Sequence, residues 1–293
     1  MFDLPFNHNE KSSTLLTFFF IGMLFSLMTL CIGIVRERQA SRWLSLLLFL
    51  CSMYIIPHML GYAGWYFNDF TADILFFIPF MQVFLIGPVV YFYTKSLLNP
   101  EFRLTREGYF HFLPAIIYAL YSLVIFVTDK VILDEYYFYA DGRDKDLANW
   151  YQASGLVSMV AYLLLSLRFY SRYKQRIFDE VSYAETVLFS WVRNFMFAFL
   201  SLLVLRVLFF ILNPDWGQFG SQFWYYLSFS FVFTYVAIAG YSNVIKNVTI
   251  AEVGLAEYNV FGDEKEMEPQ EVTPPTVAVT KVAHVEEDKP ALL

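Results

Sequence analysis

Residues 14–35 read TLLTFFFIGMLFSLMTLCIGIV and contain no charged side chain. At about 1.5 Å of rise per residue, a helix of this length crosses the roughly 30 Å hydrocarbon core of a bilayer. Lipid offers no partner to unpaired backbone groups, so such a stretch has to be helical. Six further apolar stretches follow, at 43–63, 74–98, 109–128, 150–170, 187–212 and 222–242. The sequence therefore predicts an all-α, polytopic membrane protein built as a seven-transmembrane-helix bundle.

The composition of the whole chain supports a membrane environment. Hydrophobic residues make up 58% of the 293 residues and charged residues only 16%, whereas soluble proteins carry about 25% charged residues. The two cysteines, Cys31 and Cys51, each lie in an apolar run, which excludes a secreted disulfide framework. The net charge of −7 argues against a nucleic-acid-binding surface in the residues present.

Charge and proline divide the chain into three parts. Residues 1–13 form an N-terminal segment, and residues 14–242 form the helical membrane domain. Residues 243–293 hold ten acidic residues against four lysines, together with four of the eleven prolines. A segment of this composition buries too little apolar surface to fold, so we expect a disordered acidic tail or linker over 243–293.

Basic residues flank the apolar stretches unequally. Ten lie near the connections that follow the first, third and fifth stretches, and four lie on the opposite side. Cytoplasmic connections of membrane proteins carry the excess of lysine and arginine. We therefore expect a multi-pass protein with its N-terminus outside and its tail in the cytoplasm. The ten residues are Arg36, Arg38, Arg42, Lys95, Arg103, Arg106, Arg168, Arg172, Lys174 and Arg176.

Three polar side chains interrupt the outer halves of the predicted spans. Arg206 lies in the sixth span, His58 in the second and Gln82 in the third. A guanidinium is expensive at this depth unless it faces the interior of the bundle. We hypothesise that the three residues line a pocket, open to the outside, for a small polar or anionic ligand. The alternative is that Arg206 extends outward to the interface, while His58 and Gln82 only bond neighbouring helices.

Proline and glycine in the third span indicate a flexible point. Pro79, Gly87 and Pro88 form a hypothetical hinge, because proline removes a backbone donor and kinks a helix. Kinks are also common in bundles that do not move. The outer connection 129–149 carries several carboxylates, but their spacing does not match a calcium-binding loop. We expect it to form a solvated acidic cap, and we predict neither a metal nor a cofactor.

The pattern of residues favours one functional class over others. The chain shows none of the motifs of a nucleophile–base pair, a metal cluster or a phosphate-binding loop, so we do not expect an enzyme. A sensor or signal-transduction module needs an outer pocket, a bistable bundle and a cytoplasmic segment, and this arrangement fits the chain best. A small transporter or channel-like protein is the alternative, and a scaffold that recruits a soluble partner is the third reading.

Short stretches along the chain also carry a resemblance. They are GYAGWY at 61–66, GPVVYFY at 87–93, KSLLNP at 95–100, HFLP at 111–114, DGRD at 141–144 and GYSN at 240–243. The series resembles the membrane-embedded N-terminal half of Bacteroidetes AraC-type transcriptional regulators, which join a seven- or eight-helix bundle to a C-terminal helix-turn-helix domain.

The resemblance implies a sensor in the bacterial inner membrane whose output regulates transcription. The helix-turn-helix domain is absent from this chain, so we expect no direct contact with nucleic acid in the residues present, and DNA binding is assigned to the missing C-terminal domain. The expected partners are the lipid bilayer and a small polar or anionic ligand on the outer side. Pairing as a homodimer is left open.

Overall fold

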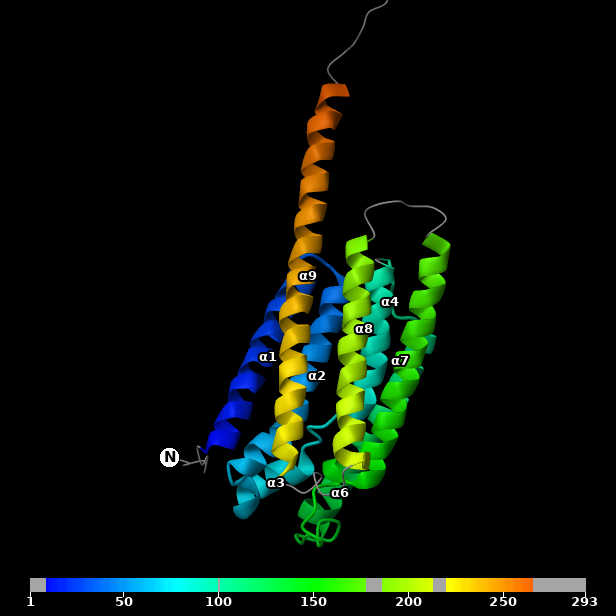
Figure 1. Cartoon of the computed structure of the whole chain (residues 1–293). Helices are drawn as coiled ribbons and strands as arrows, with labels where there is room; N and C mark the ends of the chain where they lie inside the picture. Colours follow the sequence, from blue (N-terminus) through cyan, green and yellow to red (C-terminus); the bar gives the residue numbers. More distant parts are fainter. Residues whose placement is uncertain (1–8, 100, 178–185, 213–219, 266–293) are drawn as a thin grey trace, which may run out of the picture. The chain divides into compact units, whose positions relative to one another are not determined.

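The computed structural model describes residues 9–99, 101–177, 186–212 and 220–265, and the regular elements in these ranges are all helices (Figure 1). Six of them are long and apolar enough to cross a membrane, which makes the chain an all-α, multi-pass membrane protein. The six spans are Glu10–Val35, Gln39–Tyr62, Arg106–Ile132, Asn149–Gln175, Ser190–Leu212 and Gln222–Asn247.

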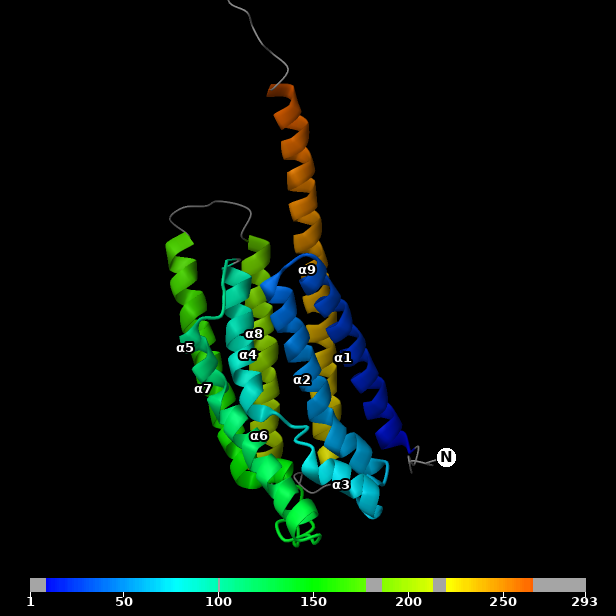
Figure 2. The same ribbon diagram turned by 180° about the vertical axis from the view of Figure 1, so that it is seen from behind.

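The helices run alternately between two ends of the bundle. At one end α2 (Gln39–Tyr62) finishes and α9 (Gln222–Lys265) begins, with the connection 133–148 between α6 and α7. We call this the loop end; it lies at the bottom of Figures 1 and 2. At the other end α1 (Glu10–Val35) finishes and α2 begins. We call this the tail end.

The first two helices cross closely because small residues face each other. Gly22 of α1 leaves no room for a side chain, since an added Cβ would lie 2.3 Å from Ser52 Oγ of α2. One turn further along, Ser26 Oγ donates to the Ser45 carbonyl (2.9 Å), and Ser45 Oγ donates to the Ser26 carbonyl (2.8 Å). Small residues and reciprocal hydroxyl bonds are the means by which helices associate where lipid provides no hydrophobic driving force.

The third expected span is not one continuous helix. The stretch 74–98 contains the end of α3 (Asp69–Phe77) and the whole of α4 (Val83–Leu98), with residues 78–82 non-helical between them. The break follows from Pro79, which disfavours a helical conformation in the residue before it. Ile78 is accordingly extended, with φ −93° and ψ 115°. The prediction of a single helix over 74–98 is therefore wrong.

The other two residues of the hypothetical hinge lie inside α4. Gly87 packs against Tyr162 of α7 (Asn149–Ile177), and an added Cβ would lie 2.7 Å from its ring. Pro88 follows within the same helix. At about 1.5 Å per residue the sixteen residues of α4 span about 24 Å, less than a typical hydrocarbon core. The backbone break thus falls at Pro79, and whether any of the three residues acts as a hinge stays a prediction.

The fourth and sixth spans both change winding near the loop end. The fourth combines α5 (Arg106–Tyr109), a 3₁₀ turn, α6 (Leu113–Phe126) and a π-helical turn at Val127–Ile132. The sixth combines α8 (Thr186–Val207) with a π-helical turn at Leu208–Leu212, directly after Arg206. Such turns often mark functional sites.

The boundary of the expected tail lies later than residue 243. The structure continues α9 as a helix to Lys265, whereas a disordered tail is expected from residue 243. These residues lack proline, and Pro269 is the first one beyond residue 243. Residues 249–265 belong to a second structural unit, which begins at Thr249. The rest of the expected tail, 266–293, lies outside the described residues, as do residues 1–8 of the N-terminal segment.

Neighbouring helices pack in the pairs α1 with α2, α2 with α4, α4 with α7 and α7 with α8, as Figures 1 and 2 show from opposite sides. The centre of the bundle holds fully buried side chains such as Leu44, Val89 and Phe195. The outward faces carry exposed apolar side chains, for example Ile116 and Leu120 of α6. An exposed apolar surface of this kind is suited to contact with lipid.

Candidate functional site

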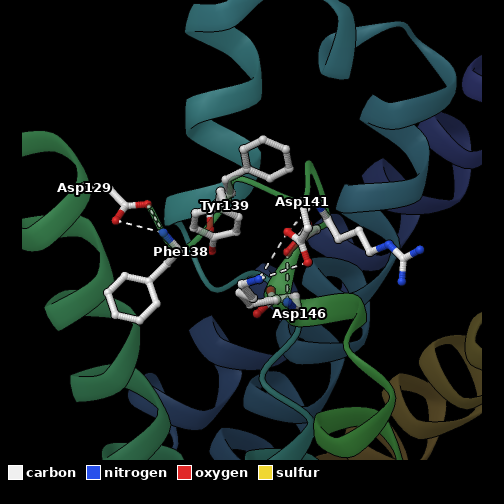
Figure 3. A network of polar contacts seen from close by, with 9 residues as sticks. Asp129, Phe138, Tyr139, Asp141 and Asp146 are labelled. Atoms are coloured by element: carbon white, nitrogen blue, oxygen red, sulfur yellow. Dashed lines mark hydrogen bonds and ion pairs between the residues drawn. The ribbon is translucent and has the colours of Figure 1, made fainter. Parts of the chain in front are cut away.

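The connection 133–148 is folded onto the bundle by bonds to buried groups. The fully buried Asp129 carboxylate accepts the Phe138 N–H with both oxygens, at 3.1 and 3.2 Å (Figure 3). The Tyr139 ring stacks on Phe76 of α3 with 4.8 Å between ring centroids, and its hydroxyl donates to the Phe76 carbonyl. Gly142 then turns the chain with a φ of +63°, a value that favours glycine.

Two buried aspartates follow this turn. Asp144 is 5% exposed and Asp146 is 4% exposed, so the expected solvated acidic cap is wrong for this pair. Asp144 accepts a hydrogen bond from Tyr66 OH at 3.0 Å and from the Asp146 N–H at 2.9 Å. Asp146 accepts from Tyr118 OH of α6 at 2.6 Å. Buried carboxyl groups require such partners, and here tyrosines from separate elements provide them.

The helix break at 78–82 supplies the remaining partner of the pair. Met81 is fully buried, and its N–H donates to the second Asp146 oxygen at 2.9 Å. The Met81 carbonyl accepts from Tyr151 OH of α7 at 2.6 Å. Backbone groups that a continuous helix would have paired internally are therefore paired with side chains of the loop end.

Burial raises the pKa of both carboxyl groups, and the two titrate as a pair. The pKa of Asp144 rises to about 8, through burial first and the neighbouring charge of Asp146 second. Burial raises the pKa of Asp146 to about 6, and hydrogen bonds from Tyr118 and the Met81 N–H oppose the rise. Burial therefore favours a pair that holds one proton and one negative charge over a doubly ionised pair.

A chain of polar contacts leads from the pair into the bundle. The Gln152 side chain of α7 donates to the Asp146 carbonyl, and it accepts from the Arg206 guanidinium of α8. Arg206 also donates to the Gln152 carbonyl at 3.1 Å. Its guanidinium carbon lies 5.8 Å from the ring centroid of Tyr54 on α2, and Tyr54 OH lies 3.2 Å from Tyr225 OH on α9. The contacts thus join the loop end to α2 and α9.

The structure brings two of the three sequence-predicted ligand residues to one aromatic cluster. Arg206 is 5% exposed and faces the bundle interior beside Tyr54. His58 is 1% exposed, stacks on Tyr226 with 3.9 Å between centroids, and hydrogen-bonds to Gln222. The Tyr54 and Tyr226 rings are 5.6 Å apart.

Gln82 takes a separate position, and its side-chain amide donates to the Pro79 carbonyl at 2.8 Å. The cavity that Arg206 lines measures about 20 Å³, room for about one water molecule. A ligand at this point would have to displace side chains. The hypothesis of a shared ligand site at Arg206, His58 and Gln82 stays a prediction.

A larger pocket opens beside the aspartate pair at the loop end. Its volume is about 550 Å³, and its walls include Tyr66, Phe67, Arg143 and Asp144. Sequence reasoning passed over Asp144, Asp146, Tyr66 and Tyr118. A signal was present in the alternation of acids at 141, 144 and 146, but the tyrosines that bury them come from distant parts of the chain.

The described residues contain no group of three or more metal-ligating side chains close enough to hold a metal ion. Comparisons of the chain with models of protein families, with curated proteins and with solved structures gave no match.

Proposed function

We propose that this protein is a membrane sensor that transmits a signal from the loop end to the tail end. In the orientation that the basic residues predict, the loop end faces the outside of a bacterial inner membrane and the tail end faces the cytoplasm. The resemblance to the receptor half of AraC-type regulators supports this class. It implies an output on transcription through a DNA-binding domain.

One observation carries the proposal: the polar contacts from Asp144 through Gln152 and Arg206 reach Tyr225 of α9. Gln152 donates to the backbone carbonyl of Asp146, so a change of charge in the pair acts on Gln152 by moving this part of the connection, and such a movement shifts the partner of the Arg206 guanidinium. The Arg206 side chain of α8 lies beside the Tyr54 ring of α2, and it lines a small cavity together with Tyr54 and Tyr225 of α9. A stimulus at the loop end can therefore favour one arrangement of α9 over another, which is what a two-state sensor requires.

The experiment is amide hydrogen exchange of the full chain in lipid nanodiscs. Asp144→Asn replaces one carboxyl group of the pair with a neutral amide. It should change the exchange of tail-end amides, around residues 169–177 of α7 and 240–247 of α9. Adding Gln152→Leu to the same variant should cancel the tail-end change, because it cuts the connection to Arg206. Glu135→Gln, an exposed acid on the same connection, is the matched control. Changes confined to the loop end would overturn the proposal.

The helix break between α3 and α4 supports a second candidate function, that of a transporter. Non-helical backbone within membrane-spanning segments often marks the substrate site of transporters, and residues 78–82 separate α3 from α4 in this way. Solute flux in proteoliposomes separates the two classes. Uptake that Asp146→Asn abolishes would favour transport, whereas tail-end exchange without flux favours sensing.

A further inference from the structure

The pocket at the loop end has the volume of a small-molecule site and is partly open. Its volume of about 550 Å³ falls within the range of about 300–1,000 Å³ of ligand pockets. The walls come from three parts of the chain: the end of α2, the turn before α3, and the connection that leads into α7. Six of the lining residues are Gly61, Tyr66, Phe67, Arg143, Asp144 and Asn149.

The charges of the pocket are arranged in depth. The buried wall holds the Asp144 carboxyl, which the carboxyl of Asp146 backs. Of the two basic residues in the lining, Lys145 is already engaged, with its ammonium 3.3 Å from Asp141 and 5.2 Å from the Tyr139 ring centroid. Arg143 and Asp141 are exposed charged residues of the lining. The buried part of the lining is therefore acidic, and its exposed part carries both signs of charge.

Aromatic rings stand next to the buried acidic part of the lining. Tyr66 donates its hydroxyl to Asp144 and also lines the pocket. Phe67 lines it as well and is 93% exposed. Aromatic faces attract cations, most strongly where water is excluded. A buried carboxylate beside aromatic rings is suited to an organic ammonium group rather than to an inorganic anion.

We infer that this pocket binds a small amine-bearing molecule of amino-acid size, with Asp144 as the counter-ion of the ammonium group and Tyr66 and Phe67 beside it. The exposed Arg143 binds the carboxylate when the ligand is a zwitterion. The inference rests on the proposed function where it makes this molecule the stimulus of the sensor. Binding of the molecule does not require that a signal follows.

Binding and protonation are linked at Asp144. An ammonium ligand favours the ionised carboxylate, so it displaces the proton of the pair. The affinity should therefore rise with pH up to about 8 and then level off. The titratable and charged groups that face Asp144 are Asp146 and Lys145 of the same connection, Tyr139, Tyr66 of the turn before α3, and Tyr118 of α6.

The test uses the full chain in detergent and a panel of matched probes. The panel holds the twenty standard amino acids, the amines that remain when their carboxyl group is removed, and the acids that remain when their amino group is removed. Thermal shift identifies binders, and isothermal titration calorimetry at pH 6, 7 and 8 measures them. Binders should come from the first two sets, and their affinity should increase with pH.

Substitutions assign the contacts. Asp144→Asn should weaken every binder on the order of tenfold to a hundredfold, the loss expected for a hydrogen bond to a charged group. Arg143→Gln, at an exposed position, should weaken the amino acids and leave the simple amines unchanged. Glu135→Gln lies outside the pocket lining and should leave both unchanged.

The outcomes separate this inference from the proposed function. Binding only by the acids that lack an amino group, no binding anywhere in the panel, or binding that Asp144→Asn leaves intact would overturn the inference. If amines bind but tail-end hydrogen exchange does not respond to them or to Asp144→Asn, the ligand site stands and the sensor proposal fails. If tail-end exchange responds to Asp144→Asn and no amine binds, the reverse holds.

Discussion

Raising the pH from 6 to 8 should destabilise this protein through one side chain, Asp144. Its pKa is raised to about 8 from an ordinary 3.8 by burial and by the charge of Asp146. Across that window the folded protein holds a proton that the unfolded chain has released, so stability falls as the pH rises. The stabilisation is full below about pH 4 and is lost by the time the pH has passed about 8. Between pH 6 and pH 8 this corresponds to a loss of about 2 kcal/mol in the free energy of unfolding, because half of the group is still protonated at pH 8.

The assay is thermal unfolding of the detergent-solubilised chain at pH 6, 7 and 8, followed by intrinsic fluorescence. A loss of this size lowers the unfolding midpoint on the order of 5–10 °C. Asp144→Asn has no proton to release and should show a nearly constant midpoint over the same range. Glu135→Gln, an exposed acid of the same connection, should keep the wild-type slope. A constant midpoint in the wild type, or an equal slope in Asp144→Asn, would refute the reasoning.

Three further predictions test other parts of the structure. Gly22→Ala places a Cβ 2.3 Å from Ser52 Oγ and should destabilise by about 1–3 kcal/mol, whereas Gly220→Ala meets nothing within 4 Å and should be neutral; equal unfolding midpoints would contradict the tight crossing. Arg206→Leu removes a charged donor from two part-buried oxygens of Gln152 and should destabilise by about 2 kcal/mol, measured by the same unfolding assay; an unchanged midpoint would show that the contact is dispensable. Protease added to spheroplasts, whose outer membrane has been removed, should cut near Gly142 and spare the C-terminal end, as detected by terminal epitope tags; the opposite pattern would exclude the predicted orientation.

The membrane helices were predictable because lipid imposes one rule on every span. A long apolar run must be helical, and the runs at 14–35 and 43–63 correspond closely to α1 and α2. The same rule failed at 74–98, because residues 78–81 stay apolar while the backbone of 78–82 leaves the helix. The hydropathy of a stretch carries no information about which group accepts a hydrogen bond from each backbone N–H. At Met81 that partner is Asp146, 65 residues away in the sequence.

The candidate site was harder to predict than the spans. A short run of acidic and basic residues between two spans is normally solvated, and Asp141 is indeed exposed. The burial of Asp144 and Asp146 depends on hydroxyl groups of Tyr66 and Tyr118, which only the folded bundle brings near. The cost of a lipid-exposed guanidinium placed Arg206 among the candidates, but nothing in the sequence could name Gln152 as its partner.

The last helix is longer than its membrane-spanning part, which ends at Asn247, close to the predicted residue 242. Acidic composition argued for disorder from residue 243, yet the residues up to Lys265 contain no proline, and α9 can continue through them. The composition was taken over the whole of 243–293, so it did not distinguish the proline-free residues 243–265 from the rest.

The open peptide at Met81 makes the order of assembly matter. Its carbonyl also accepts the nearby Val83 N–H, but its N–H is paired only when the connection before α7 has delivered Asp146. Until that moment the insertion of the third span leaves this N–H unpaired in an apolar environment, which is unfavourable. We therefore expect the connection 133–148 to dock late during biogenesis. A chain whose later helices fail to pack would expose both this connection and residues 78–82 to quality-control proteases.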